Sequence, residues 1–154
     1  MTNEETLKKL LIEKIGIPED KVSIHRARRI FAEVPLNNFI EIFAKIIKET
    51  GFYMLPAVTG TDEGENFGVS YHMSREDGTM LTLKTFTPKA CPEIKTVTGY
   101  FPSATLYERE LEDLLGIKVL GLAAGKRYPL PDDWPKGEYP LRKDWHPAPK
   151  EVNK

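Results

Sequence analysis

The chain has 154 residues, of which 40% are hydrophobic and 29% charged, and this length suffices for one domain with a core plus an extension. The formal net charge of −1 argues against a dedicated nucleic-acid-binding domain, which would be strongly basic. Because Cys91 is the only cysteine, the chain can form no internal disulfide and cannot alone hold a thiolate-only metal site or an iron–sulfur cluster.

No apolar run approaches the ~18 residues that span a bilayer. The first residues are acidic and lack the basic-then-apolar pattern of a secretory signal. These features predict a cytoplasmic protein that reaches a membrane only through its partners.

The first part of the chain alternates between helical and strand-like periods. Residues 3–15 predict an amphipathic helix, which Gly16 followed by Pro18 ends. Residues 21–34 have an uneven strand-like pattern interrupted by a basic cluster. Residues 35–50 predict a second helix, with proline in its first turn and apolar residues at helical spacing.

After the second helix the period becomes that of strands. Strands are predicted at 52–58, 67–73 and 80–87, with a polar acidic loop at 60–66 and a hairpin turn at Asp77-Gly78. The chain shows no internal repeat. These elements predict an α+β fold of two layers, with helices on one face of a mostly antiparallel sheet of three to four strands.

A third helix is predicted at 103–116, after a connector that contains prolines. Thr105 and Glu108 have the spacing of a capping box. Arg109 and Asp113 are four residues apart and could pair across one helical turn. A free-standing enzyme that uses the carboxylates of the 108–113 helix as acid and base is one hypothesis for the function.

Residues 121–154 have no helical or strand period. They hold both tryptophans and half of the twelve prolines. Proline keeps such a segment extended, and Trp134, Tyr139 and Trp145 are residue types that dominate protein interfaces. The sequence therefore predicts an α+β domain over 1–120 and an extended tail that docks on a partner subunit. That the tail folds back on its own domain is the alternative, and the two interpretations are compatible.

Other residues that could support chemistry are few. His25, His72 and His146 lie far apart without ligand spacing, and no Gly-x-Ser-x-Gly nucleophile motif is present. Cys91 lies in a predicted loop, and the sequence implies no base for it. We therefore assign no catalytic, metal-binding or cofactor-binding residue to this chain.

The basic cluster contains Arg26, Arg28 and Arg29. A nucleic-acid-binding module is a further hypothesis, and it predicts salt-sensitive binding. The cluster lacks interleaved aromatic residues, so a solvated edge or a contact with another protein is favoured.

Several segments, taken in this order, resemble a known family: Val97–Ala104, Tyr107–Glu110, Asp113–Ile117, Leu130–Trp134 and Pro140–Asp144. The family is the thirty-kilodalton subunit of respiratory complex I, shared with the related subunit of membrane-bound, energy-converting nickel–iron hydrogenases. The resemblance covers about residues 87–145, and the first 86 residues agree only in the order of their elements.

The sequence departs from this family after the third predicted helix. Leu122 and Ala123 stand where the family usually has His-Pro, and Tyr128 and Pro129 replace aliphatic residues after the retained basic pair Lys126-Arg127. The short chain and these departures favour the hydrogenase branch or another complex I-like archaeal or bacterial membrane complex. The thirty-kilodalton subunit of a true NADH (or other donor):quinone oxidoreductase is the alternative.

The resemblance implies a non-catalytic, cofactor-free subunit of the hydrophilic arm, on the cytoplasmic face of the cell membrane. Its implied partners are the large catalytic subunit, the small iron–sulfur subunit nearby and the membrane-embedded subunits, with no nucleic acid. The nickel–iron (NiFe) centre and the iron–sulfur clusters are expected in those partners. The residues expected at the partner interface are Glu108, Arg109, Glu110, Asp113, Lys126, Arg127, Asp132, Asp133, Trp134, Leu141, Arg142, Lys143, Asp144 and Trp145.

Overall fold

The computed structural model describes residues 3–148, so that Pro149 and the rest of the predicted tail up to 154 lie outside the described residues. Its helices are α1 (Asn3–Leu10, continued by a π-helical turn at Leu11–Ile15), α2 (Phe39–Thr50) and α3 (Ala104–Leu115), with 3-10 turns at Glu19–Lys21 and Leu36–Asn38. Its strands are β1 (Val22–Arg26), β2 (Arg29–Glu33), β3 (Met54–Asp62), β4 (Asn66–Ser74), β5 (Met80–Pro88), β6 (Glu93–Lys95) and β7 (Lys118–Leu120). Within 3–148, no helix combines the length and apolar character needed to cross a membrane.

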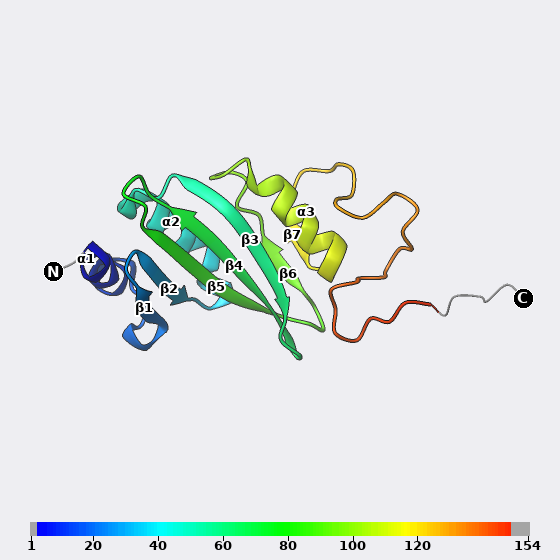
Figure 1. Cartoon of the computed structure of the whole chain (residues 1–154), viewed down its shortest axis with the longest axis horizontal. Coiled ribbons are helices and arrows are strands. Elements are labelled where there is room, and N and C mark those ends of the chain that lie inside the picture. Colours follow the sequence, from blue (N-terminus) through cyan, green and yellow to red (C-terminus); the bar gives the residue numbers. More distant parts are fainter. Residues whose placement is uncertain (1–2, 149–154) are drawn as a thin grey trace, which may run out of the picture.

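The main sheet has five strands in the order β1-β2-β5-β4-β3 (Figure 1). Every pair in it is antiparallel except β2 with β5, and β6 pairs with β7 in parallel as a separate small sheet. The sheet has at least one strand more than expected, because residues 21–34 form a hairpin. The chain reverses at Ala27 and Arg28, where Arg28 adopts a φ of 60°.

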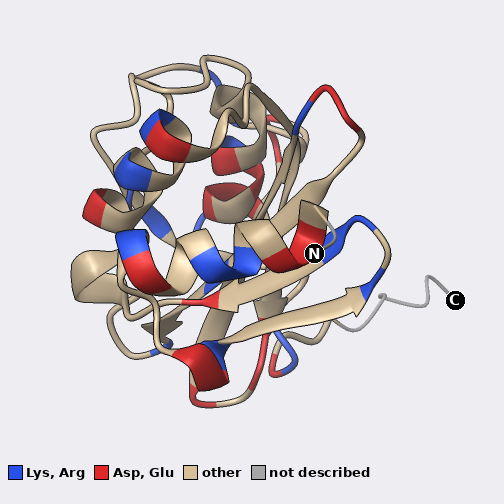
Figure 2. Ribbon diagram, turned by 90° about the vertical axis from the view of Figure 1, so that its left-hand side faces the viewer, with Lys and Arg blue, Asp and Glu red and all other residues tan. Residues whose placement is uncertain are grey.

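The helices cover one face of this sheet, which confirms the predicted two-layer α+β fold (Figure 2). Alternate residues of β4, including Tyr71, are fully buried. The rings of Phe39 and Phe43 on α2 lie 4.8 and 5.6 Å from the Tyr71 ring, measured between centroids. On the other face His72 is half-buried, and its ring nitrogens hydrogen-bond to the hydroxyls of Thr59 and Thr82 on the neighbouring strands.

Helix α3 lies beside the edge strand β3 (Figure 1). Leu111 and Leu115 are buried where β3 presents Gly60. A Cβ atom at position 60 would lie 2.5 Å from Leu115 Cδ1 and 2.6 Å from Leu111 Cδ2, so any larger residue there would have to displace these two buried side chains. This contact fixes α3, and with it the charged residues described next, to the sheet.

Candidate functional site

Glu108 lies inside the chain. Its side chain is fully buried, and it accepts hydrogen bonds from the Thr96 hydroxyl at 2.5 Å and the Val97 amide at 2.7 Å. Burial raises the pKa of this carboxyl, while the two hydrogen bonds oppose that change. The capping box expected with Thr105 is therefore not formed. Glu108 attaches α3 to the segment after β6 and does not present its carboxylate to a partner.

Arg109 points from α3 to the loop that follows β7. Its Nη2 donates to the Ala123 carbonyl at 3.0 Å and its Nη1 to the Lys126 carbonyl at 3.3 Å. The guanidinium passes so close to Gly125 that a Cβ there would lie 2.2 Å from Nη2. Arg109 therefore holds the start of the tail instead of pairing with Asp113.

Asp113 is the main attachment point for the next part of the tail. Its Oδ1 accepts from Arg127 Nε at 2.9 Å and Nη2 at 2.7 Å, and its Oδ2 accepts from the Leu130 amide at 2.7 Å. Arg127 Nη1 also donates to the Trp134 carbonyl at 2.9 Å. Because the Asp113 side chain is only 6% exposed, this ion pair with its two hydrogen bonds to Oδ1 is largely shielded from water.

The two tryptophans pack against each other. The ring centroids of Trp134 and Trp145 are 5.8 Å apart, and both indole N–H groups donate to Glu138, one to its carbonyl and one to its carboxylate. Both residues remain partly exposed. The result is a closed aromatic loop at the end of the molecule rather than a segment spread out in solvent.

The later tail residues are attached to the end of α3. The Leu141 amide donates to the Leu114 carbonyl at 3.1 Å, and Arg142 Nε donates to the Leu115 carbonyl at 2.7 Å. These bonds satisfy carbonyl groups that a helix C-terminus leaves open. The described part of the tail therefore folds back on its own domain, which was the alternative interpretation. Docking on a partner stays a prediction.

Asp62, at the end of β3, provides a further attachment point for the tail, at Lys143. Its Oδ2 accepts from Lys89 Nζ at 2.8 Å and from the Lys143 amide at 2.9 Å, and Lys89 also pairs with Asp144 at 3.2 Å. The hydrogen bond from Lys89, together with the Lys143 and Gly64 amides, lowers the pKa of Asp62 to about 2, although burial acts in the opposite direction. Asp62 thus joins the sheet to a segment 81 residues later.

Acid is expected to release the tail in a step that depends on Asp62. A carboxyl whose pKa falls from 3.8 to about 2 on folding contributes stability that is complete above pH ~4 and lost as the pH falls toward 2. Since both tryptophans lie in the tail, their fluorescence between pH 7 and 2 reports this step. Asp62→Asn should remove the acid step and leave the tail loosened at neutral pH.

Asp77→Asn is the matched control for that change. The pKa of Asp77 is also lowered to about 2, by a hydrogen bond from Arg75, but the group lies at the β4–β5 turn. This variant should keep the acid step in tryptophan fluorescence. An unchanged step in Asp62→Asn would show that the tail is held by other contacts.

The structure distributes the predicted interface residues over three environments. Glu108 and Asp113 are buried; Arg109, Glu110, Arg127, Trp134, Arg142 and Trp145 are half-buried; Lys126, Asp132, Asp133, Leu141, Lys143 and Asp144 are exposed. The partly exposed and exposed groups lie on α3 and the tail and are available to another protein. Sequence reasoning did not single out Asp62, Lys89 or Gly125, because their roles follow only from contacts with residues far along the chain.

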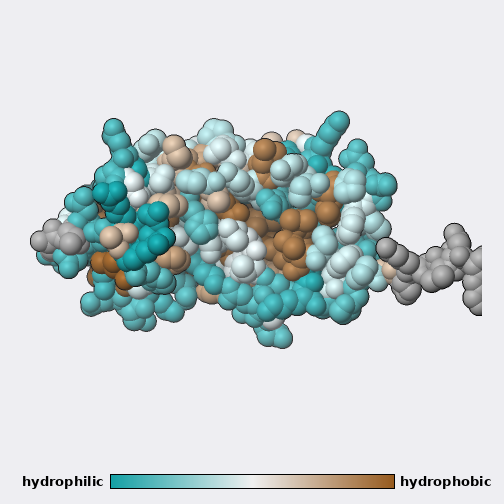
Figure 3. All heavy atoms as spheres, in the orientation of Figure 1, coloured by the Kyte–Doolittle hydropathy of each residue, from teal (hydrophilic) through white to brown (hydrophobic). Residues whose placement is uncertain are grey.

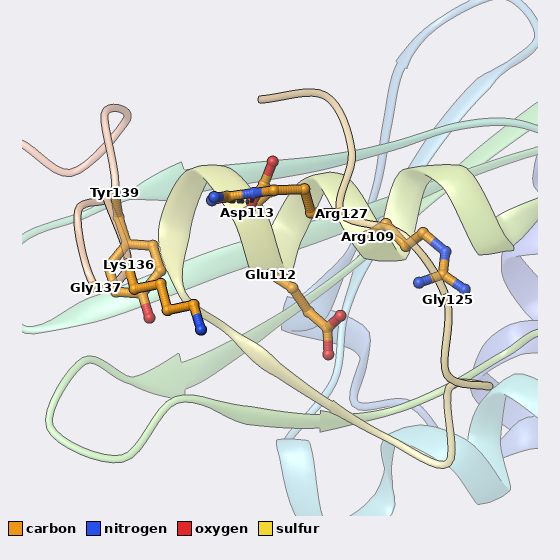
Figure 4. A pocket seen from close by; sticks show the side chains of 8 residues that line it. All are labelled: Arg109, Glu112, Asp113, Gly125, Arg127, Lys136, Gly137 and Tyr139. Atoms are coloured by element: carbon orange, nitrogen blue, oxygen red, sulfur yellow. Dashed lines mark hydrogen bonds and ion pairs between the residues drawn. The ribbon is translucent and has the colours of Figure 1, made fainter. Parts of the chain in front are cut away.

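The tail and α3 enclose a polar cup of about 420 Å³ (Figure 4). Its walls are formed by Arg109, Glu112, Asp113, Gly125, Arg127, Lys136, Gly137 and Tyr139. A smaller groove of about 160 Å³ separates β3 from α3, and Val58, Leu111, Leu114 and Leu141 are among its lining residues. Apolar side chains gather over the α3 and β3 part of the face seen in Figure 3. The surface beside the tail is therefore partly polar and partly apolar, as protein interfaces are.

The histidines and Cys91 do not form a metal-binding cluster among residues 3–148. Over residues 3–148, no group of three or more His, Cys, Asp and Glu side chains is placed to hold a metal ion. The ring of His25 stacks on Phe31 with centroids 4.0 Å apart, and Cys91 is exposed.

Comparison with models of protein families shows to which family the chain belongs. A family model described as the 30 kDa subunit of the respiratory-chain NADH dehydrogenase matches residues 32–151. The chain belongs to this family, as the motifs of its last third predicted.

The relatives come from several kinds of complex. The chain is 39% identical over 95 residues to formate hydrogenlyase subunit 5 of Escherichia coli, an alignment covering 58% of this chain but only 17% of that protein. It is 31% identical over 115 residues to an NADH-quinone oxidoreductase subunit of Moorella thermoacetica, covering 73% and 76% of the two chains. A chain in the structure of the membrane-bound sulfane sulfur reductase, an archaeal respiratory membrane complex, superposes with a TM-score of 0.79 at 28% identity, covering 93% of this chain and 85% of that one.

Proposed function

We propose that this protein is a non-catalytic structural subunit in the hydrophilic arm of a complex I-like membrane-bound oxidoreductase. In this proposal it packs on the large catalytic subunit through α3 and the tail. Membership of the 30 kDa family supports the role, and the relatives are subunits of respiratory and hydrogenase complexes. The folded tail is the observation that carries the proposal, because it presents the half-buried Trp134 and Trp145 in one fixed arrangement.

An energy-converting nickel–iron hydrogenase is the favoured kind of complex. The 39% identity to the formate hydrogenlyase subunit exceeds the 31% identity to the NADH-quinone oxidoreductase subunit, although the aligned region is shorter. The nickel–iron centre and iron–sulfur clusters would belong to partner subunits, as would attachment to the cytoplasmic face of the membrane. A quinone-reducing or sulfane-reducing complex is the alternative to test, since relatives of both kinds are found.

A free-standing enzyme is less well supported by the geometry. Glu108 is fully buried and Asp113 is neutralised by Arg127, so neither can reach a substrate from the surface. Only Glu110 and Glu112 of this helix keep partly exposed carboxylates.

The first experiment is purification of the tagged chain from its own cells in a mild detergent, with mass spectrometry of the associated proteins. Co-purification with a large catalytic subunit, a small iron–sulfur subunit and membrane proteins is expected. Hydrogen evolution, NADH oxidation and sulfane reduction by the same sample then identify the kind of complex. Recovery of the chain alone, with turnover of its own, would overturn the proposal.

Trp134→Ala is expected to weaken assembly while the α+β domain stays folded. Truncating an aromatic interface residue typically costs ~2 kcal/mol, which corresponds to a loss of affinity of about thirtyfold. The measurement is the fraction of chain that remains with the large subunit, together with circular dichroism of the isolated variant.

Tyr53→Ala provides the control, because Tyr53 is 60% exposed and precedes β3, away from the tail. This variant should assemble normally. An intact complex at normal yield with Trp134→Ala would contradict a docking role for the tail.

A further inference from the structure

The cup between α3 and the tail contains three charged side chains that lack an ion-pair partner among the described residues. Arg109 donates only to carbonyl oxygens, and Glu112 accepts only from the Val119 amide, at 3.2 Å. Lys136, from the tail, is exposed. In the described part of the chain, none of the three takes part in an ion pair. The two other charged residues of the cup, Arg127 and Asp113, form an ion pair with each other.

These three charges are arranged in a row. In Figure 4 the Glu112 carboxylate lies between the Arg109 guanidinium and the Lys136 ammonium. Arg109 and Glu112 are three residues apart on α3, which makes them neighbours on one face of the helix. The cup therefore presents positive, negative and positive charge in succession along α3.

We propose that the cup receives a polypeptide segment of the partner subunit that carries an acidic, a basic and an acidic side chain in matching order. This inference rests on the proposed function and names the chemistry of the segment that docks there. Complementary charges placed opposite one another fix the register of two proteins and exclude partners with the wrong order.

The alternation argues for a peptide rather than a small anion. Counted together, Arg109, Arg127 and Lys136 against Glu112 and Asp113 leave the cup with a net charge of about +1, and its one unpaired carboxylate stands in the middle of the row. A phosphate or another compact polyanion would be repelled by Glu112. A segment with alternating charges meets each group with its opposite, for example from a helix with these residues three or four positions apart.

The cup has walls that are already fixed. Asp113 holds Arg127 and the Leu130 amide, and Arg109 holds the Ala123 and Lys126 carbonyls. Since the tail does not have to be ordered during docking, more of the contact energy is available for recognition.

Zero-length crosslinking tests the inference on the complex purified as described above. A carbodiimide joins an amine directly to a carboxylate, and mass spectrometry then locates the linked residues. Lys136 is expected to be joined to an Asp or Glu of the large subunit, and Glu112 to a Lys of the same segment. Lys95, which is exposed on β6, is the control amine and should remain unlinked and open to acetylation.

Charge reversal gives an independent measurement. Lys136→Glu is expected to lower the fraction of chain retained on the complex by about tenfold, whereas Lys95→Glu leaves it unchanged. The isolated Lys136→Glu variant should keep its circular dichroism spectrum, because Lys136 is exposed.

The outcomes separate this inference from the proposed function. If no large subunit accompanies the wild-type chain, the proposed function fails. If the complex forms but Lys136 is acetylated as readily as Lys95, or is joined only to its own chain, the subunit role survives and the charged cup is not the docking site.

Discussion

Glu108→Ala is expected to lower the free energy of unfolding by about 3 kcal/mol. The change leaves the Thr96 hydroxyl and the Val97 amide without their acceptor in a buried place and opens a cavity under α3. At this chain length the loss corresponds to a fall in melting temperature of about 8 °C. Urea unfolding followed by circular dichroism measures the free energy, and a thermal scan measures the temperature.

Glu110→Ala is the matched control, since this residue lies on the same helix and keeps a partly exposed carboxylate. It should change the free energy of unfolding by no more than about 0.5 kcal/mol. Equal effects of the two substitutions would mean that Glu108 contributes no more than an ordinary surface carboxylate.

Asp113→Ala is expected to cost about 3 kcal/mol, and the loss should appear first in the tail. Removal of one member of a shielded ion pair leaves the other charge unpaired, here Arg127 with a side chain 26% exposed. Leu130 also loses the acceptor for its amide. Hydrogen exchange should therefore become faster at Leu130 and around Trp134, and urea unfolding measures the total.

The double variant Asp113→Ala with Arg127→Met separates the effect of the unpaired charge on stability from the effect of lost packing. Because the unpaired charge is then removed as well, the double variant should be more stable than Asp113→Ala alone. Asp132→Ala, in the exposed part of the tail, serves as the neutral control. A double variant less stable than the single one would contradict the assigned role of the pair.

Regular elements were predictable where one period governs the side chains. The second helix was expected over 35–50, and α2 with its preceding 3-10 turn covers Leu36–Thr50, because its apolar residues face one buried surface. The hairpin at Asp77-Gly78 was also correct, since Asp77 accepts from the Thr79 amide and glycine supplies the positive φ. The hairpin at residues 21–34 was harder to predict, because Arg28 forms its turn with a φ that residues other than glycine rarely adopt.

The site was less predictable because its contacts join distant residues. A glutamate within a charged run indicates an exposed helix face, yet Glu108 is buried by the chain before its own helix. Asp62 belonged to a segment interpreted only as an acidic loop, and nothing local signals its bond to the Lys143 amide. The family motifs located α3 and the tail, but not which of their charges are exposed.

The contact between Asp62 and Lys143 also has a consequence for synthesis of the protein. Asp62, on β3, and Lys89, directly after β5, leave the ribosome well before residue 143, and the N-terminal parts of a chain fold first during synthesis. The sheet can therefore form while the aromatic loop is still missing. A nascent or truncated chain that ends before Lys143 would carry the folded sheet without the attached aromatic loop, so the surface that we propose to bind the large subunit is complete only after the tail has been translated.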